Sequence, residues 1–178
     1  MQIEVFTEDS GTTGEKANVE QVEDFFRGGF LPIKDLSSEL ASYGDVSVHI
    51  LSEEYGYLKG SDSTIELSTS DEDNANAIRR FSEEISEASR TADVIVILLT
   101  KSVFEETVTE QWDTLVSNTK SDSIWCIGAS RSAVSPVNIE KLRSESGAVI
   151  VYERIGVARI SNEHKDELIE AVRQASAE

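Results

Sequence analysis

The chain has 178 residues, the size of one domain, and we expect a single domain over residues 1–178. Its 34 acidic residues against 16 basic ones give a formal net charge of −18, and the lack of any basic run argues against DNA binding and other nucleic-acid partners. A single cysteine, Cys126, excludes an intrachain disulfide, and the longest apolar run, Val94–Leu99, is far too short to span a membrane.

The first part of the chain predicts a strand, a loop and a helix. Gln2–Thr7 alternates and is rich in β-forming residues, which is typical of a strand. Glu8–Ala17 is polar and contains two glycines, so we expect a loop. Asn18 is expected to cap a helix whose apolar residues recur at helical spacing until Gly28.

A second helix, a strand and a third helix are expected next. Pro32 suits the first turn of a helix, and Gly44 is expected at its C-terminal cap. Val46–Leu51 predicts the second strand, and Thr64–Ser68 a short extended piece. Ala77–Ala88 carries the apolar face of a helix that begins among acidic residues, which favour helix N-termini.

The second half of the chain continues the alternation of strands and helices. Asp93–Thr100 is continuously apolar, which is typical of a central strand covered on both faces. Lys101–Asn118 predicts one helix, Ser123–Ile127 a buried strand, Ile139–Ser146 a short helix and Ala148–Tyr152 the last core strand.

Three smaller features complete the prediction. Arg131–Asn138 contains a proline and is expected to be a loop. Gly156 is expected to turn the chain into a hairpin with Val157–Ile160. Ser161 or Asn162 is expected to cap the C-terminal helix.

This order of elements predicts an α/β fold: a three-layer, Rossmann-like domain with a mostly parallel sheet of about five strands. In open parallel sheets, ligands bind at the carboxyl ends of the strands. The informative residues are therefore those that directly follow each strand. They are polar and rich in Ser, Thr or Gly in the four stretches 7–14, 52–60, 100–102 and 128–132.

The loop after the first strand contains the small residues and the lysine of an anion-binding loop. Ser10, Thr12 and Lys16 are the candidate ligand-binding residues here. The loop lacks the glycine spacing of a P-loop and of the GxGxxG motif. A surface loop without a ligand is the alternative interpretation.

The turn after the second strand is the most specific stretch of the sequence. Ser52 and Tyr55 are candidate hydrogen-bond partners of a ligand, and Glu54 is the candidate general acid or base. In the alternative interpretation the turn is only capped, with Ser52 bonded to the following backbone. Lys101, after the central strand, is a candidate contact for a phosphate.

Other residues with chemical potential are interpreted as structural. Cys126 lies in an apolar run, His49 alternates with apolar residues of a strand, and Trp112 lies on the inner face of a helix. The glutamates 105, 106 and 110 are assigned to the solvated face of that helix. No HxxxH, CxxC or carboxylate cage indicates a metal, and no cofactor can be identified from the sequence.

The stretch VHILSEEYGYLKGSD, residues 48–62, resembles the motif LSAKYGLL-x-P-D of a group of small α/β proteins that includes the YaaA peroxide stress proteins. The resemblance covers about Ile3–Thr107. It departs from the motif at Glu53-Glu54 and at Lys59-Gly60, and after the first strand only Lys16 matches the group's basic segment. The matching residues are Leu51, Ser52, Tyr55, Gly56, Leu58 and Asp62.

The resemblance implies a pocket formed by Ser52, Tyr55, Gly56 and the loop after the first strand. It further implies a nucleotide- or nucleobase-like ligand, with hydrolase or glycosidase-like chemistry as the accompanying reaction. Some members are linked to DNA, but the basic elements for that function are absent from this sequence.

The alternative is a non-catalytic interaction module that docks on a partner or on a second copy of the chain. The stretch from Ala92 to Trp112 is similar, without the flanking motifs, to TIR-like and deoxyribosyltransferase-like Rossmannoid domains. This alternative predicts an exposed apolar patch that involves Trp125 or Phe30.

The excess of acidic residues, with seven lysines in the whole chain, predicts a protein of a halophilic cytoplasm. A surface of like charge repels itself at low salt and is tolerated where salt screens it. The residues MQIEVFTED carry no secretory signal pattern, which agrees with a cytoplasmic location.

Overall fold

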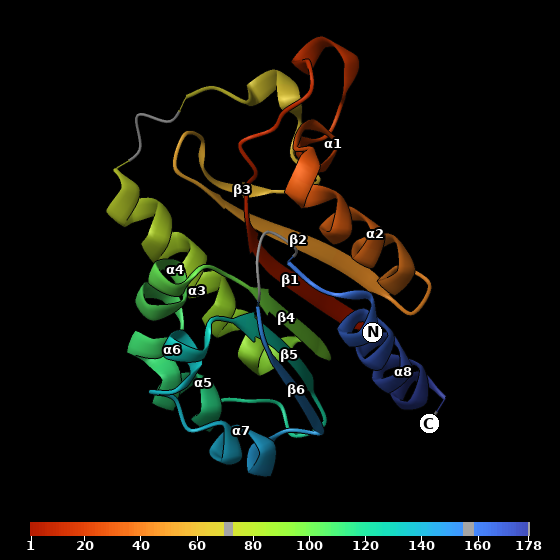
Figure 1. The fold of residues 1–178 in the computed structure, drawn as a ribbon, viewed down its shortest axis with the longest axis vertical. Helices are drawn as coiled ribbons and strands as arrows, with labels where there is room; N and C mark the ends of the chain where they lie inside the picture. Colours follow the sequence, from red (N-terminus) through yellow and green to blue (C-terminus); the bar gives the residue numbers. More distant parts are fainter. Residues whose placement is uncertain (70–72, 155–158, 178) are drawn as a thin grey trace.

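The computed structural model describes residues 1–69, 73–154 and 159–177, and a six-stranded sheet lies at its centre (Figure 1). The strand order is β3-β2-β1-β4-β5-β6. Five neighbouring strands are parallel, and only β3 pairs antiparallel, with β2. The strands are β1 (Gln2–Glu8), β2 (Asp45–Ser52), β3 (Gly56–Lys59), β4 (Val94–Leu98), β5 (Ile124–Ala129) and β6 (Ala148–Glu153).

Helices cover both faces of the sheet, because neighbouring residues of the central strands point to opposite sides. On β1, Val5 belongs to the core under α1, α2 and α8, whereas Phe6 belongs to the core under α3 to α7. The helices are α1 (Val22–Phe25), α2 (Leu31–Leu40), α3 (Asn74–Thr91), α4 (Lys101–Thr107), α5 (Trp112–Ser117), α6 (Arg131–Val134), α7 (Ile139–Glu145) and α8 (Asn162–Ser176). Four 3-10 turns are η1 (Lys16–Asn18), η2 (Gly28–Phe30), η3 (Thr64–Glu66) and η4 (Thr109–Gln111).

The direction of the chain reverses between β1 and β4. The connection from β1 to β2 passes through α2 on one face, and the connection from β2 to β4 passes through α3 on the other (Figure 1). The carboxyl ends of β1 and β4 therefore lie at a topological switch point. In open α/β sheets this is where a crevice for a ligand forms.

The turn that carries the motif residues Ser52, Tyr55 and Gly56, called the motif turn below, forms a tight hairpin between β2 and β3. Ser52 pairs with Gly56, and the φ angle of Gly56 is 77°, in the left-handed region that disfavours residues with a Cβ. The strand β3 is only four residues long, Gly56–Lys59. The hairpin adds an antiparallel edge strand that the sequence did not predict, since the short run GYLK reads as part of a polar turn.

The predicted fold class is confirmed, with all five predicted core strands present and in a mostly parallel sheet. The long helices α3 and α8 are also present, the latter capped by Ser161 as expected. Cys126, His49 and Trp112 are buried, in agreement with their structural interpretation.

Several local predictions were wrong. Asn18 lies in η1, and the helix that follows is only the four residues of α1, with Gln21 at its N-cap. Gly44 is not in the left-handed conformation; instead, a Cβ there would collide with the carbonyl group of Met1. Thr64–Ser68 is not extended, because Ser63 caps the turn η3 by accepting from the N–H of Ile65.

The second half holds two further differences. The predicted helix Lys101–Asn118 is divided into α4, η4 and α5. The division falls at the β-branched run Thr107-Val108-Thr109, which lowers helix propensity. The predicted loop at Arg131–Asn138 begins with α6. Of the predicted hairpin, residues 155–158 lie outside the described residues.

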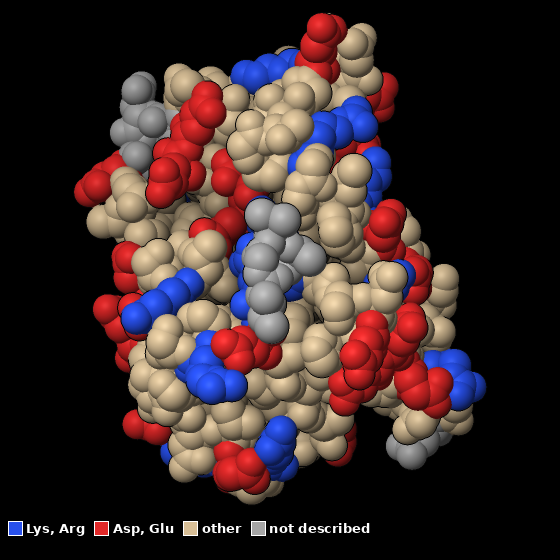
Figure 2. All heavy atoms as spheres, viewed as in Figure 1, with Lys and Arg blue, Asp and Glu red and all other residues tan. Residues whose placement is uncertain are grey.

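The face of the molecule shown in Figure 2 carries Lys and Arg side chains dispersed among Asp and Glu side chains. No broad basic area is visible among the described residues on that face. None of the helices within residues 1–69, 73–154 and 159–177 combines the length and the apolar character that crossing a membrane requires.

Candidate functional site

A hollow of about 600 Å³ lies at the carboxyl ends of β1, β2 and β4, at the switch point of the sheet. Leu51, Ile78 and Val103 contribute its apolar wall. Five carboxylates and two guanidinium groups dominate its polar lining. The carboxylates are Glu8, Asp9, Glu53, Glu54 and Glu106, and the guanidinium groups are those of Arg154 and Arg159.

Glu8 ties the end of β1 to the start of α4. Its carboxylate accepts a hydrogen bond from the backbone N–H of Thr100 at 2.6 Å and one from the hydroxyl of Thr100 at 2.9 Å. The N–H of Thr100, the N-cap residue of α4, therefore already donates to a carboxylate of the protein itself at a helix end that favours negative charge. Glu8 thus places a negative charge beside the start of this helix.

Asp9 connects β1 to the motif turn. Its carboxyl group accepts a hydrogen bond from the Ser52 hydroxyl at 2.6 Å, and Ser52 in turn accepts from the N–H of Tyr55 at 3.0 Å. Burial raises the pKa of Asp9, although the Ser52 hydrogen bond acts against that rise. A carboxyl group that is partly desolvated and faces a hollow is suited to proton transfer.

Arg159 braces the end of β1 from the opposite end of the chain. Only 6% of it is exposed, and its guanidinium donates to the Thr7 hydroxyl at 2.7 Å and to the carbonyl groups of Glu8 and Asp9. The Nε of Arg159 and the Nη1 of Arg154 are buried and have no acceptor among the described residues. Burial lowers the pKa of Arg159, and the nearby charge of Arg154 lowers it further.

The motif turn divides its candidate residues between the hollow and the core. Glu54 is exposed and lines the hollow. Ser52 is buried and caps the turn, the geometry of the simpler interpretation. The ring of Tyr55 packs edge-on against that of Phe25 at 6.0 Å and does not line the hollow, although its hydroxyl bonds to the side chain of Glu54. Gly56 shapes the backbone of the hairpin.

The other candidate residues do not line the hollow. The hydroxyl of Ser10 lies within hydrogen-bond distance of two carbonyl oxygens, that of Arg27 at 2.5 Å and that of Thr12 at 2.9 Å. Lys16 donates to the carbonyl of Leu67 at 2.6 Å, and its Nζ lies 5.5 Å from the centre of the Tyr55 ring. Lys101 is exposed and pairs with Glu105 at 3.7 Å. The loop after β1 therefore packs on the motif turn through Lys16.

A second buried polar cluster lies on the α3 face of the sheet. His49 Nε2 lies 2.6 Å from a carboxylate oxygen of Glu4, and His49 Nδ1 lies 2.6 Å from the hydroxyl of Tyr57. The imidazole also stacks on Phe6, with ring centroids 4.4 Å apart. Burial opposes ionisation of Glu4, but hydrogen bonds from His49 hold its pKa below the usual range.

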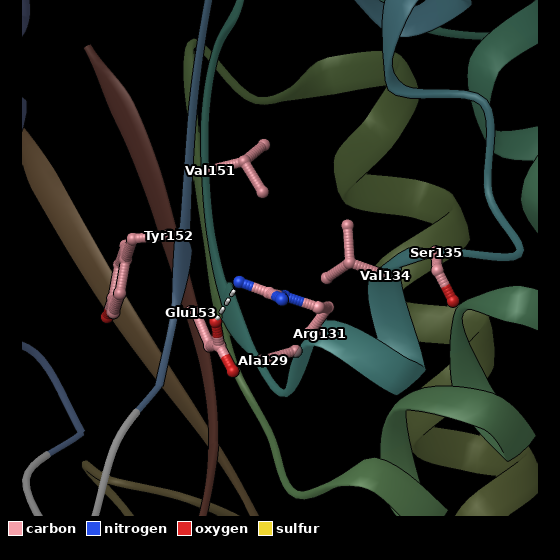
Figure 3. A pocket seen from close by; sticks show the side chains of 7 residues that line it. All are labelled: Ala129, Arg131, Val134, Ser135, Val151, Tyr152 and Glu153. Carbon is pink, nitrogen blue, oxygen red and sulfur yellow. Dashed lines mark ion pairs between the residues drawn. The ribbon is translucent and has the colours of Figure 1, made fainter.

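Another hollow, of about 240 Å³, lies beside the edge strand β6 (Figure 3). Val134 and Val151 face it. The ion pair of Arg131 and Glu153 lies at its side, with 3.2 Å between the charged atoms. Tyr152 points to the opposite face of β6. It offers few polar groups for recognition.

Among the described residues no group of three or more His, Cys, Asp or Glu side chains is arranged to hold a metal ion.

The apolar patch expected for an interaction module is not built from its predicted residues. Trp125 and Phe30 are both fully buried, because Trp125 lies in β5 and Phe30 ends η2 under α2. Those two assignments were wrong. The large hydrophobic residues found exposed in the described part of the chain, Leu31 and Ile65, are separate in the sequence and lie on different elements.

Sequence reasoning missed most of the charged lining of the hollow. Glu8 and Asp9 lie within a stretch that was recognised as informative, and only their roles went unnoticed. Arg159 had no local signal, since it meets Thr7 across 152 residues of sequence. Comparison of the sequence with protein-family models and with curated proteins finds no match to either.

Proposed function

We propose that the chain binds a nucleotide- or nucleobase-like ligand in the hollow at the switch point, as the resemblance of its motif turn implies. The observation that carries the proposal is the position of this hollow, at the carboxyl ends of β1, β2 and β4. Its volume of about 600 Å³ is in the range of small-molecule sites. Carboxylates are acceptors for the hydroxyl groups of a ribose.

The accompanying reaction that fits these carboxylates is hydrolysis of an N-glycosidic bond. Glu54, exposed at the rim, takes the proton of an attacking water, while Asp9, with its raised pKa, gives its proton to the departing base. The bond from the sugar carbon to nitrogen breaks, and a bond to the water oxygen forms. The proton gained by Glu54 restores Asp9 through solvent.

The binding claim is tested by thermal-shift screening with nucleosides, nucleotides and free bases at high salt. We expect a ligand of this class to raise the melting temperature. No stabilisation by any of them would contradict the proposal. The reaction is tested by chromatography of the released base, which Glu54→Gln and Asp9→Asn should each reduce at least about a hundredfold. Glu66→Gln, an exposed glutamate on η3, is the matched control and should leave the rate unchanged.

We further propose that the protein works in a salt-rich cytoplasm. The net charge of −18 supports this setting. Dialysis to low salt, followed by circular dichroism, should unfold the chain. A protein that stays fully folded without salt would overturn this part of the proposal.

A further inference from the structure

The two arginines of the hollow have donors that nothing in the described structure uses. Arg159 Nε and Arg154 Nη1 are each shielded from solvent and lack an acceptor among residues 1–69, 73–154 and 159–177. A buried donor without a partner costs free energy comparable to a lost hydrogen bond. An acceptor supplied by another molecule would remove this cost.

The pair is also unfavourable as a pair of charges. Arg154 and Arg159 line the same hollow, and they lie close enough for the charge of one to act on the other. The carboxylates of Glu8 and Asp9 offset part of this repulsion at Arg159, and their oxygens already accept hydrogen bonds from Thr100 and Ser52. An anion placed at the arginines would both neutralise the repulsion and accept the unused hydrogen bonds.

The rest of the hollow is closed to such an anion. At the start of α4 the N–H of Thr100 already donates to Glu8, and at the start of α3 the N–H of Ala75 already donates to Asp73, so each helix start has a carboxylate beside it. The rim on the β2 side carries the carboxylates of Glu53 and Glu54, which repel negative charge. Within the described lining, the cationic side chains are those of Arg154 and Arg159, and these two attract an anion most strongly.

We propose that Arg154 and Arg159 bind the phosphate of a phosphomonoester ligand, and that Glu53 and Glu54 face its sugar. This inference rests on the proposed function and defines its ligand as a nucleoside monophosphate rather than a nucleoside or a free base. A monophosphate offers three acceptor oxygens for the two guanidinium groups. The remaining carboxylates of the lining disfavour the additional charge of a di- or triphosphate.

Titration calorimetry of the full chain at constant high salt tests the assignment. The probes are the four common ribonucleosides, their 5′-monophosphates and ribose 5-phosphate. We expect at least one monophosphate to bind about tenfold to hundredfold more tightly than its nucleoside, as charge-assisted hydrogen bonds imply. Arg154→Gln should remove this difference. Arg131→Gln, which removes a cation paired with Glu153 outside the hollow, should preserve it.

The outcomes separate this inference from the proposed function. If nucleosides bind as tightly as monophosphates, or if Arg154→Gln keeps the preference while remaining folded, the phosphate assignment is wrong and the proposed function stands. If ribose 5-phosphate binds through Arg154 but no nucleoside or nucleotide does, the phosphate site stands and the nucleotide-like ligand is wrong. If none of the probes binds, both are contradicted.

Discussion

Two buried polar clusters of this protein differ in how completely their hydrogen bonds are satisfied. In the cluster of Glu4, His49 and Tyr57, both imidazole nitrogens have partners at 2.6 Å. In the hollow at the switch point, Arg154 and Arg159 each keep a buried N–H without an acceptor in the described structure. The first cluster is complete by itself and needs no ligand. We propose that a ligand supplies the acceptors that the second cluster lacks.

The satisfied cluster joins three strands of the sheet. Glu4 lies on β1, His49 on β2 and Tyr57 on β3. A neutral imidazole that donates to Glu4 and accepts from Tyr57 satisfies every group at once. Burial raises the pKa of Tyr57, so its hydroxyl keeps the proton that it donates. The cluster thereby fixes the motif hairpin to the centre of the sheet.

The largest expected effect on stability comes from breaking this satisfied cluster. His49→Ala should lower the free energy of unfolding by about 3 kcal/mol, because it leaves a buried carboxylate and a buried hydroxyl without their partner. Chemical denaturation at high salt measures the change. His164→Ala is the control: His164 lies in the first turn of α8 and stacks on Tyr152, and its loss should cost about 1 kcal/mol. Equal losses of unfolding free energy in the two variants would show that the Glu4, His49 and Tyr57 cluster has no special role in stability.

The next effect concerns the hairpin that brings Tyr57 to His49. Gly56→Ala should cost about 1 to 2 kcal/mol, since the φ angle of 77° disfavours a residue with a Cβ. Gly11→Ala is the control, with open space around the position and no φ in the left-handed region, and it should change stability by less than about 0.5 kcal/mol. An unchanged midpoint of chemical denaturation for Gly56→Ala would show that the hairpin can form with a turn that does not need the left-handed φ angle at this position.

Removal of an unsatisfied group should have a smaller effect. Arg154→Met should raise the free energy of unfolding without ligand by about 1 kcal/mol, because it removes a buried donor that has no acceptor in the described structure. The same denaturation measurement provides the value. A loss as large as that of His49→Ala would mean that Arg154 is a structural residue.

The smallest expected effect is on the pH dependence of stability, to which the carboxyl groups of Glu4 and Asp9 contribute with opposite signs. The pKa of Glu4 is lowered in the folded state, so its contribution to stability is present above the pKa of the unfolded chain and is lost as the pH falls through the folded value. The pKa of Asp9 is raised, so its ionisation costs stability as the pH rises from the unfolded to the folded value.

Glu4→Gln should therefore lower stability near neutral pH and lose its effect in acid. Asp9→Asn should raise stability near neutral pH and likewise lose its effect in acid. Unfolding midpoints of both variants between about pH 3 and 7 test the two slopes. Slopes of the same sign would contradict the opposite environments of the two carboxyl groups.

The sequence allowed the sheet to be predicted because its signals are local. The apolar run of β4 and the alternation in β1 each reveal a strand without knowledge of any other part of the chain. The strand β3 was missed for the opposite reason. Its four residues form a strand only because Gly56 turns them back onto β2 and Tyr57 reaches His49.

The candidate site was predictable only in its general position. The polar stretches after β1 and β2 do meet at the switch point, as the fold class requires. Which side chain enters the hollow could not be read from the residues: Ser52 turns to Asp9, whereas Glu54 faces the opening. The contribution of Arg159 depends on the packing of the C-terminal part against β1, which no local pattern encodes.

A crystal structure of the protein grown with a saturating nucleoside monophosphate tests the central claim most directly. We expect density for the ligand in the hollow at the ends of β1, β2 and β4, with its phosphate within hydrogen-bond distance of Arg154 and Arg159 and its sugar beside Glu53 and Glu54. A hollow without ligand, or a ligand bound elsewhere, such as beside β6, would contradict it.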